Sequence, residues 1–135
     1  FVGDVDMVND EVLALLLDNG ITPVVSPITF SAEGDLLNTN ADSVASAVAM
    51  GLARRYDVEL VFAFDKRGVL LDVEDDDSLI ETITPELYAE FREREKIHSG
   101  TIPKIDNAYK TIEAGVGSVR ITSHEDFNGG TLVIK

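Results

Sequence analysis

Apolar residues recur along this chain at spacings that predict helices alternating with strands. Between Asn9 and Gly20 they return every three or four positions, which predicts a helix over residues 10–18. Small apolar residues dominate 41–55 and predict a helix buried against a sheet. The continuous apolar run at 58–64 is typical of an interior strand of a parallel sheet.

The remaining pattern continues the alternation. Further helices are expected over 85–96 and 103–115, strands over 21–28, 36–37, 119–122 and 131–134, and turns at 31–35 and 128–130. Pro23 and Pro27 interrupt the first of these strands, so we expect it to pair along only part of its length. Strands that alternate with helices predict the α/β class. We expect a three-layer αβα sandwich around a mainly parallel open sheet. The absence of linkers, repeats and low-complexity tracts indicates one domain, or most of one.

Composition narrows the class of protein. The chain has 135 residues, of which 44% are hydrophobic, so it can bury a core. No apolar run approaches the roughly 20 residues of a membrane-spanning helix. A formal net charge of −14 disfavours nucleic acid and anionic membranes as partners. The chain contains no cysteine, which excludes disulfides and thiolate metal sites and fits a reducing compartment. We expect a cytoplasmic protein.

Lys104 is the first candidate for chemistry. A turn of small residues, Ser99-Gly100-Thr101, delivers it to the start of the helix expected over 103–115. Helix N-termini attract phosphate because they present free N–H groups and positive potential. A cation there is unfavourable by about 0.3–1 kcal/mol unless an anion lies nearby. Lys104 is therefore a candidate ligand of a phosphoryl group, and the alternative is a solvent-exposed lysine.

A second polar motif precedes the helix expected over 41–55. Asp42 lies near its start, where a carboxylate either stabilises the helix or holds catalytic lysines in place. Asn38 and Asn40 are two residues apart and point the same way in an extended segment. They either cap the turn or bind polar groups of a ligand.

A tight loop from Asp65 to Gly68 follows the strand expected at 58–64. Ligands of open α/β sheets bind at the carboxyl ends of strands, so this loop suits a nucleotide. The alternative is a plain connection to the next element.

We predict no metal-binding residues. The acidic stretch 72–77 matches no calcium-binding loop and is interpreted as a solvated loop. His98 and His124 lack metal-ligand spacing.

The order of these motifs resembles that of the acetylglutamate kinases, a branch of the amino acid kinase family. The resemblance spans nearly the whole chain and implies that residues 1–135 are the C-terminal, ATP-binding half of such a domain. It is carried by the segments 23–28 (PVVSPI), 37–42 (LNTNAD), 64–70 (FDKRGVL), 99–104 (SGTIPK), 115–121 (GVGSVRI) and 130–131 (GT).

The resemblance implies transfer of the γ-phosphoryl group of ATP, with Mg²⁺, to the γ-carboxylate of N-acetyl-L-glutamate or a related N-acylglutamate in arginine biosynthesis. In that scheme Lys104 neutralises the transferring group and Asp42 orients catalytic lysines, while Asn38 and Asn40 bind the acylated amino acid. The acceptor carboxylate is already ionised near neutral pH, so no general base is needed. The residues implied to bind the nucleotide are Asp65, Lys66, Arg67, Gly68, Val69, Leu70, Ser99, Gly100, Thr101 and Ile102.

The resemblance also sets further expectations. Asp42 and Lys104 should converge on one crevice. The family usually has Ser or Thr where this chain has Phe64. Its glycine-rich loop, second catalytic lysine and substrate-binding arginine should lie upstream of Phe1, so the isolated chain is expected to be inactive. The full-length protein is expected to form a homodimer or a dimer-based oligomer.

Two other functions remain open. The first is a non-catalytic ligand-sensing or assembly module with the same fold. The second is a related kinase acting on aspartate or carbamate, which the segment from Asn38 to Asp42 disfavours by resemblance.

Overall fold

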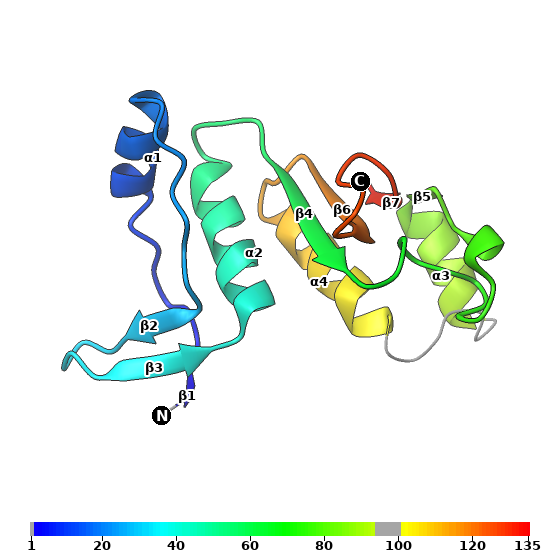
Figure 1. Ribbon diagram of the computed structural model, residues 1–135, viewed down its shortest axis with the longest axis horizontal. Helices are drawn as coiled ribbons and strands as arrows, with labels where there is room; N and C mark the ends of the chain where they lie inside the picture. The colour runs from blue at the N-terminus through cyan, green and yellow to red at the C-terminus, as the bar shows by residue number, and fades with distance from the viewer. Residues whose placement is uncertain (1, 94–100) are drawn as a thin grey trace. The chain divides into compact units, whose positions relative to one another are not determined.

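The computed structural model describes residues 2–93 and 101–135 in two compact units, residues 1–56 and 57–135. Each unit combines helices with a sheet of its own, which confirms the α/β class (Figure 1). Among the described residues, three of the five strand pairings are parallel, so the sheets are mixed with a parallel majority.

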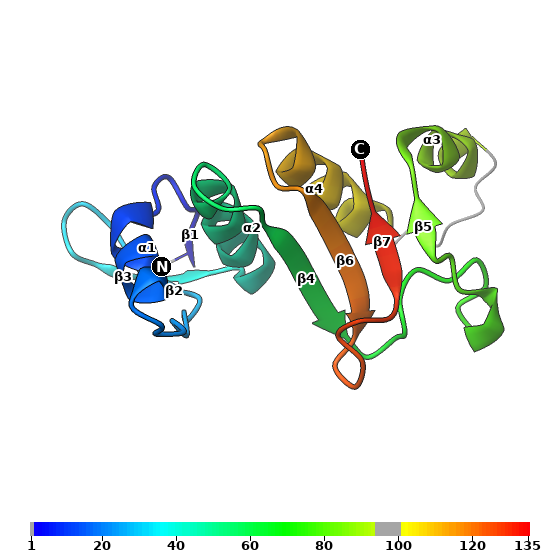
Figure 2. The same ribbon diagram turned by 90° about the horizontal axis from the view of Figure 1, so that it is seen from above.

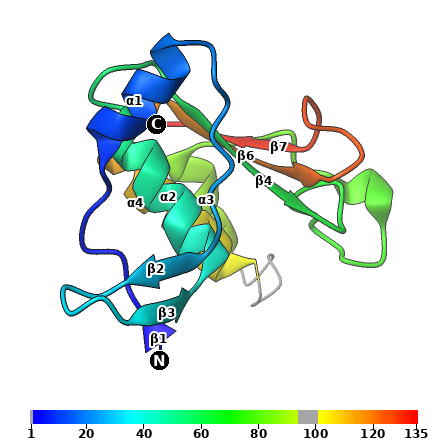
Figure 3. The same ribbon diagram turned by 60° about the vertical axis from the view of Figure 1, so that its left-hand side comes forward.

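In the first unit, two helices accompany a three-stranded sheet of order β1-β3-β2. The two helices pack against each other, as Figure 3 shows. In chain order the elements are β1 (Val2–Gly3), α1 (Asp10–Asp18), β2 (Ile28–Phe30), β3 (Leu36–Thr39) and α2 (Ala41–Leu52).

Side-chain caps open both helices of this unit. The Asn9 side chain accepts a hydrogen bond from the backbone N–H of Val12 at 3.2 Å and opens α1. Asn40 does the same for α2 through the N–H of Ser43 at 3.0 Å. The bounds predicted for α1 are therefore confirmed, and Asn40 takes the capping role that was one of its two interpretations.

The partial pairing predicted for 21–28 is confined to its last residue, so most of the expected strand is absent. Residues 21–27 form no strand, and pairing begins only at Ile28. Pro23 and Pro27 lack the N–H groups that a ladder requires, so the apolar pattern could not become a paired strand. The turn predicted at 31–35 is confirmed by a hydrogen bond from the Ser31 N–H to the Asp35 carbonyl at 2.9 Å.

The second unit contains a four-stranded sheet of order β4-β6-β7-β5, which Figure 2 shows in that sequence from left to right. In chain order its elements are β4 (Glu59–Phe64), a short 3-10 helix (Asp76–Ser78), β5 (Thr82–Ile83), α3 (Pro85–Glu93), α4 (Ile102–Glu113), β6 (Ser118–Ser123) and β7 (Thr131–Val133).

The core of the second unit lies between α4 and the strands β6 and β7. Helix α4 contributes Ile105, Ala108 and Ile112, which recur at helical spacing and are all buried. The strands contribute Val119 and Val133, both fully buried. Burial of this apolar face holds the first turn of α4 in a defined position relative to the sheet.

Strand β4 lies at the edge of its sheet, so the prediction of an interior strand is wrong for this unit. Its residues alternate between exposed and buried, as expected for a strand with one covered face.

An ion pair joins β4 to β6. Exposed Glu59 pairs with Arg120 of β6 at 2.8 Å, and this hydrogen-bonded guanidinium lowers the pKa of the Glu59 carboxyl.

A cluster of aromatic and charged side chains joins α3 to α4. The Tyr88 hydroxyl donates a 2.7 Å hydrogen bond to the Asp106 carboxylate, and the Tyr88 ring stacks on that of Tyr109. Burial, together with the Asp106 hydrogen bond, raises the pKa of Tyr88 to about 12. Burial likewise raises the pKa of Tyr109 to about 12.

These shifts predict a loss of stability at alkaline pH. Because the folded state favours the neutral phenols, their contribution is complete below pH 10 and is lost as the pH rises toward about 12. Urea unfolding from pH 9 upward should show a free energy of unfolding that falls more steeply in the wild type than in Tyr88→Phe. Equal slopes in the two proteins would contradict this assignment.

Candidate functional site

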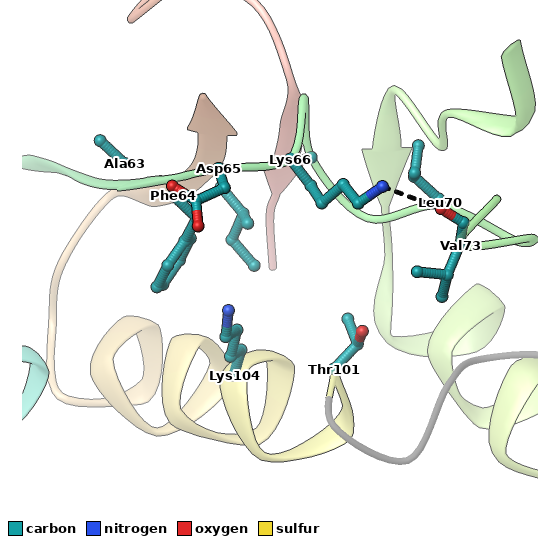
Figure 4. A pocket seen from close by; sticks show the side chains of 10 residues that line it. Ala63, Phe64, Asp65, Lys66, Leu70, Val73, Thr101 and Lys104 are labelled. Atoms are coloured by element: carbon teal, nitrogen blue, oxygen red, sulfur yellow. Dashed lines mark hydrogen bonds between the residues drawn. The ribbon is translucent and has the colours of Figure 1, made fainter. Parts of the chain in front are cut away.

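A pocket of about 390 Å³ opens in the second unit between the end of β4 and the start of α4 (Figure 4). Its position at the carboxyl end of a strand is where ligands of α/β sheets bind. The residues that line it are Ala63, Phe64, Asp65, Lys66, Gly68, Leu70, Val73, Thr101, Lys104 and Ile121.

The upper wall of the pocket is the end of β4. Phe64 is its last residue and pairs in register with Ser123 of β6. The Phe64 carbonyl accepts a hydrogen bond from the backbone N–H of His124 at 3.1 Å. This bond extends the ladder by one residue, so the backbone that enters the loop at Asp65 is held in place.

The loop itself is held by Thr131, a fully buried residue of β7. Its hydroxyl accepts a 2.8 Å hydrogen bond from the Val69 N–H and donates one of 2.6 Å to the Ile80 carbonyl. Gly68 passes close to the same residue, since a Cβ there would lie 2.7 Å from the Thr131 hydroxyl oxygen. The close backbone approach explains why glycine occupies this position.

Lys104 rises from the first turn of α4 toward the end of β4, as Figure 4 shows. Its side chain is half-buried, and its Nζ atom lies 3.4 Å from the centroid of the Phe64 ring. Thr101, which precedes the helix, makes no side-chain capping bond, and the first turn contains no acidic residue. The helix start therefore combines its own positive potential with a lysine charge, an arrangement that favours a bound anion.

Two other charged side chains line the pocket. Lys66 is exposed and donates a 3.1 Å hydrogen bond to the Val73 carbonyl, drawn as a dashed line in Figure 4. Asp65 is exposed at the mouth of the loop and supplies the only carboxylate that lines this pocket in the described part of the chain.

The predicted nucleotide-binding residues divide into three groups. Asp65, Lys66, Gly68, Leu70 and Thr101 line the pocket with Lys104. Three others do not line it, and two lie outside the described residues. Arg67 lines a different hollow, which Arg120 also lines, and Val69 is buried with its N–H bound to Thr131. Ile102 is the first residue of α4. Ser99 and Gly100 are the two that lie outside the described residues.

The predicted residues of the first unit lie around the start of α2. Asn38 is exposed on β3, where its neighbours across the ladder are Val2 and Ile28. Asn40 caps α2, and Asp42 is a half-buried residue of the first turn of that helix. A carboxylate in the first turn is stabilised by the helix dipole, which accounts locally for Asp42.

The structure adds lining residues that sequence reasoning missed. Ala63 and Val73 precede and follow the predicted loop, and Ile121 comes from β6. The pairing of Ala63 with Thr122 brings β6 beside this wall. The place of β6 beside the pocket follows from the strand order and has no signal in the local sequence. For Ala63 there was a signal, because the alternation of β4 indicates that this residue faces away from the covered side.

No metal site is formed by the described residues, among which no group of three or more His, Cys, Asp or Glu side chains gathers. The acidic stretch instead binds its own backbone, since the Asp72 and Asp75 carboxylates each accept an N–H two residues ahead at 3.0 Å. His124 is exposed directly after the end of β6, and His98 lies outside the described residues. None of the described helices has the length and apolar character of a membrane span.

This chain is similar to proteins of a known family. The sequence profile described as the amino acid kinase family matches residues 1–123. The chain belongs to the amino acid kinase family.

The curated relatives of this amino acid kinase chain include acetylglutamate kinases. That of Phocaeicola vulgatus is 48% identical over 136 residues, covering 100% of this chain and 53% of the relative. That of Cytophaga hutchinsonii is 50% identical over 125 residues, covering 93% of this chain and 47% of the relative. The chain thus spans about half the length of the curated relatives it matches.

The fold agrees with a solved structure. The crystal structure of smu.665 from Streptococcus mutans superposes with a TM-score of 0.78 at 38% identity, over 99% of this chain and 51% of that one. The expected amino acid kinase-like α/β fold, present as part of a domain, is confirmed. The pocket that contains Lys104 is therefore a pocket of an amino acid kinase fold.

Proposed function

We propose that this chain forms the ATP-binding half of a kinase that phosphorylates the γ-carboxylate of N-acetyl-L-glutamate or a related N-acylglutamate, a step of arginine biosynthesis. The observation that carries the proposal is the half-buried Lys104 ammonium in a pocket between the end of β4 and the start of α4. In a chain with a net charge of −14, a cation held inside a pocket favours an anionic ligand.

Phosphoryl transfer to a carboxylate requires alignment and positive charge rather than a base. The attacking oxygen is already ionised, while negative charge spreads over the transferring phosphoryl group. Lys104 neutralises part of that charge, and the positive potential of the α4 N-terminus adds to it. Leu70, Val73 and Ile121 give the same pocket an apolar wall suited to the uncharged part of a nucleotide.

The acceptor side of the reaction is assigned to the start of α2. Asn38 offers its exposed amide to the acylated amino acid, since within the described part of the chain it is the backbone of this residue that takes part in the β3 ladder. Asn40 offers its NH₂ group, because its amide oxygen binds the Ser43 N–H. Asp42 orients catalytic lysines, which requires it to converge with Lys104 on one crevice.

Magnesium fits this chemistry as a companion of ATP. Mg²⁺ retains several water molecules and binds substrate phosphates with one or two carboxylates. The described lining of the pocket offers one carboxylate, that of Asp65, and this fits an ion delivered with the nucleotide. When bound, the ion neutralises phosphate charge and Asp65 would hold it.

The wider setting belongs to the same proposal. The relatives that carry the name acetylglutamate kinase support small-molecule substrates, ATP and an N-acylglutamate. We also propose a cytoplasmic location, and a homodimeric or dimer-based assembly of the full-length protein.

The proposal is tested with the natural gene product that carries this sequence. ADP release is measured with N-acetyl-L-glutamate, N-succinyl-L-glutamate, L-aspartate and carbamate as acceptors, together with calorimetric titration of ATP–Mg. We expect ATP binding and turnover with an N-acylglutamate at least about 100-fold more efficient, by kcat/KM, than with the other acids, because the site must reject acceptors that leave its polar groups unpaired. ATP binding without turnover on any acceptor would instead support a ligand-sensing module.

A further inference from the structure

The ammonium group of Lys104 rests on an aromatic face. Its Nζ atom is 3.4 Å from the centroid of the Phe64 ring, well within the range of a cation–π contact. None of the ion pairs formed between described residues includes Lys104. Within the described structure, the partner of this charge is therefore a ring rather than a carboxylate.

The ring is itself held in a fixed orientation. Phe64 stacks on Phe62, with the ring centroids 6.1 Å apart and the planes inclined by 30°. Phe62 is buried, with only 7% of its surface exposed. The Phe64 backbone is tied to β6 through Ser123 and to His124 by the 3.1 Å hydrogen bond. A ring fixed by its backbone and by a buried neighbour presents one constant face to the pocket.

A carboxylate partner and an aromatic partner have different consequences for phosphate binding. A carboxylate would neutralise the lysine and compete with the phosphate for its N–H donors. An aromatic face attracts the ammonium through the ring quadrupole and adds no negative charge to the pocket. The ammonium keeps its full charge, and its N–H groups that point away from the ring stay open to an anion. Restricting the flexible lysine before binding also lowers the ordering cost of the complex.

We propose that Phe64 is a positioning residue that holds the Lys104 ammonium in the pocket, ready for the phosphoryl group of ATP. The inference rests on the proposed function for the identity of the anion. Phe64 acts through Lys104 and is not itself a catalytic residue. Lys104 contacts the ring on one side and the phosphate oxygens on the other.

The test changes the electrostatics of the ring at nearly constant shape. In the natural gene product, Phe64 is replaced by phenylalanine carrying one, two and three ring fluorines, which progressively weaken the negative face. We expect kcat with ATP–Mg and N-acetyl-L-glutamate to fall stepwise, by about threefold to tenfold across the series. The KM for N-acetyl-L-glutamate should stay constant. The same series at exposed Phe127 is the matched control and should leave kcat unchanged.

Two variants with standard amino acids serve as upper and lower references for the fluorinated series. Phe64→Tyr keeps an aromatic face and should retain activity close to the wild type, whereas Phe64→Leu should lose at least as much as the trifluorinated ring. A flat response of kcat to fluorination would overturn the proposal, because a purely steric role depends on shape and not on the quadrupole.

A second measurement is independent of catalysis. The Lys104 Nζ atom lies over the ring, so the NMR signals of the adjoining ε-methylene protons should be shifted upfield in the wild type and should return to ordinary values in Phe64→Leu. Absence of this shift in the wild type would overturn the contact itself. If no acceptor is phosphorylated, the proposed reaction fails, and the dissociation constant for ATP–Mg across the fluorinated series then decides the role of Phe64: a stepwise rise supports it and a constant value overturns it.

Discussion

Replacing Lys104 by alanine is expected to lower kcat for phosphoryl transfer by about 10²- to 10³-fold, the range seen when one preorganised donor to a developing anion is removed. The loss follows from the position of the ammonium in the pocket at the start of α4, where its half-buried charge acts in a medium less polar than water. The affinity for ATP–Mg should fall by a smaller factor, because the interaction strengthens as charge develops in the transition state.

The helix provides a matched control. Lys110 lies in the last turn of α4, is exposed and does not line the pocket, so Lys110→Ala removes the same charge from the same helix. Lys110→Ala should retain wild-type turnover and ATP affinity. Steady-state kinetics and calorimetry on the natural gene product distinguish the two variants, and equal behaviour of Lys104→Ala and Lys110→Ala would remove Lys104 from the site.

Replacing Thr131 by valine is expected to lower the free energy of unfolding by about 2–6 kcal/mol, since two buried backbone groups lose their partner and each costs about 1–3 kcal/mol. The groups are the Val69 N–H and the Ile80 carbonyl, both of which bind the fully buried Thr131 hydroxyl. Typical domains are stable by only about 5–15 kcal/mol, so this is a large fraction of the total.

Urea denaturation of the chain measures the effect, and two variants control for it. Thr82→Val makes the same chemical change at an exposed position of β5 and should shift the free energy of unfolding by no more than about 0.5 kcal/mol. Thr131→Ser keeps the hydroxyl and should recover most of the loss. If Thr131→Val unfolds at the wild-type urea concentration, the hydroxyl does not hold the loop.

Local signals in the sequence were sufficient for most of the elements. Asn9 opens α1, and Gly115, with a φ of 111°, follows the end of α4 near the expected stop. Such boundaries depend on hydrogen bonds or backbone angles within a few residues, and sequence therefore encodes them directly. The same holds for the turn at 31–35.

Longer-range features were missed or mistaken. The two-residue strands β1 and β5 are too short to produce an alternating pattern, and their pairing partners are remote along the chain. Strand β4 has the apolar composition of an interior strand but lies at a sheet edge. Composition reports how apolar a strand is, whereas its neighbours depend on how the whole sheet assembles.

By itself, the sequence determined the α/β class, the places of the helices and the motif order that resembles the acetylglutamate kinases. It gave both bounds of α1, whereas α2 ends at Leu52, three residues before its expected end. Tertiary structure alone decided which motif residues meet. It brought Lys104 onto the Phe64 ring, turned Arg67 toward a different hollow and buried Val69 against Thr131. The physical reason is that neighbouring residues of one loop point in different directions, and only strand order and helix packing decide which of those directions leads into the pocket.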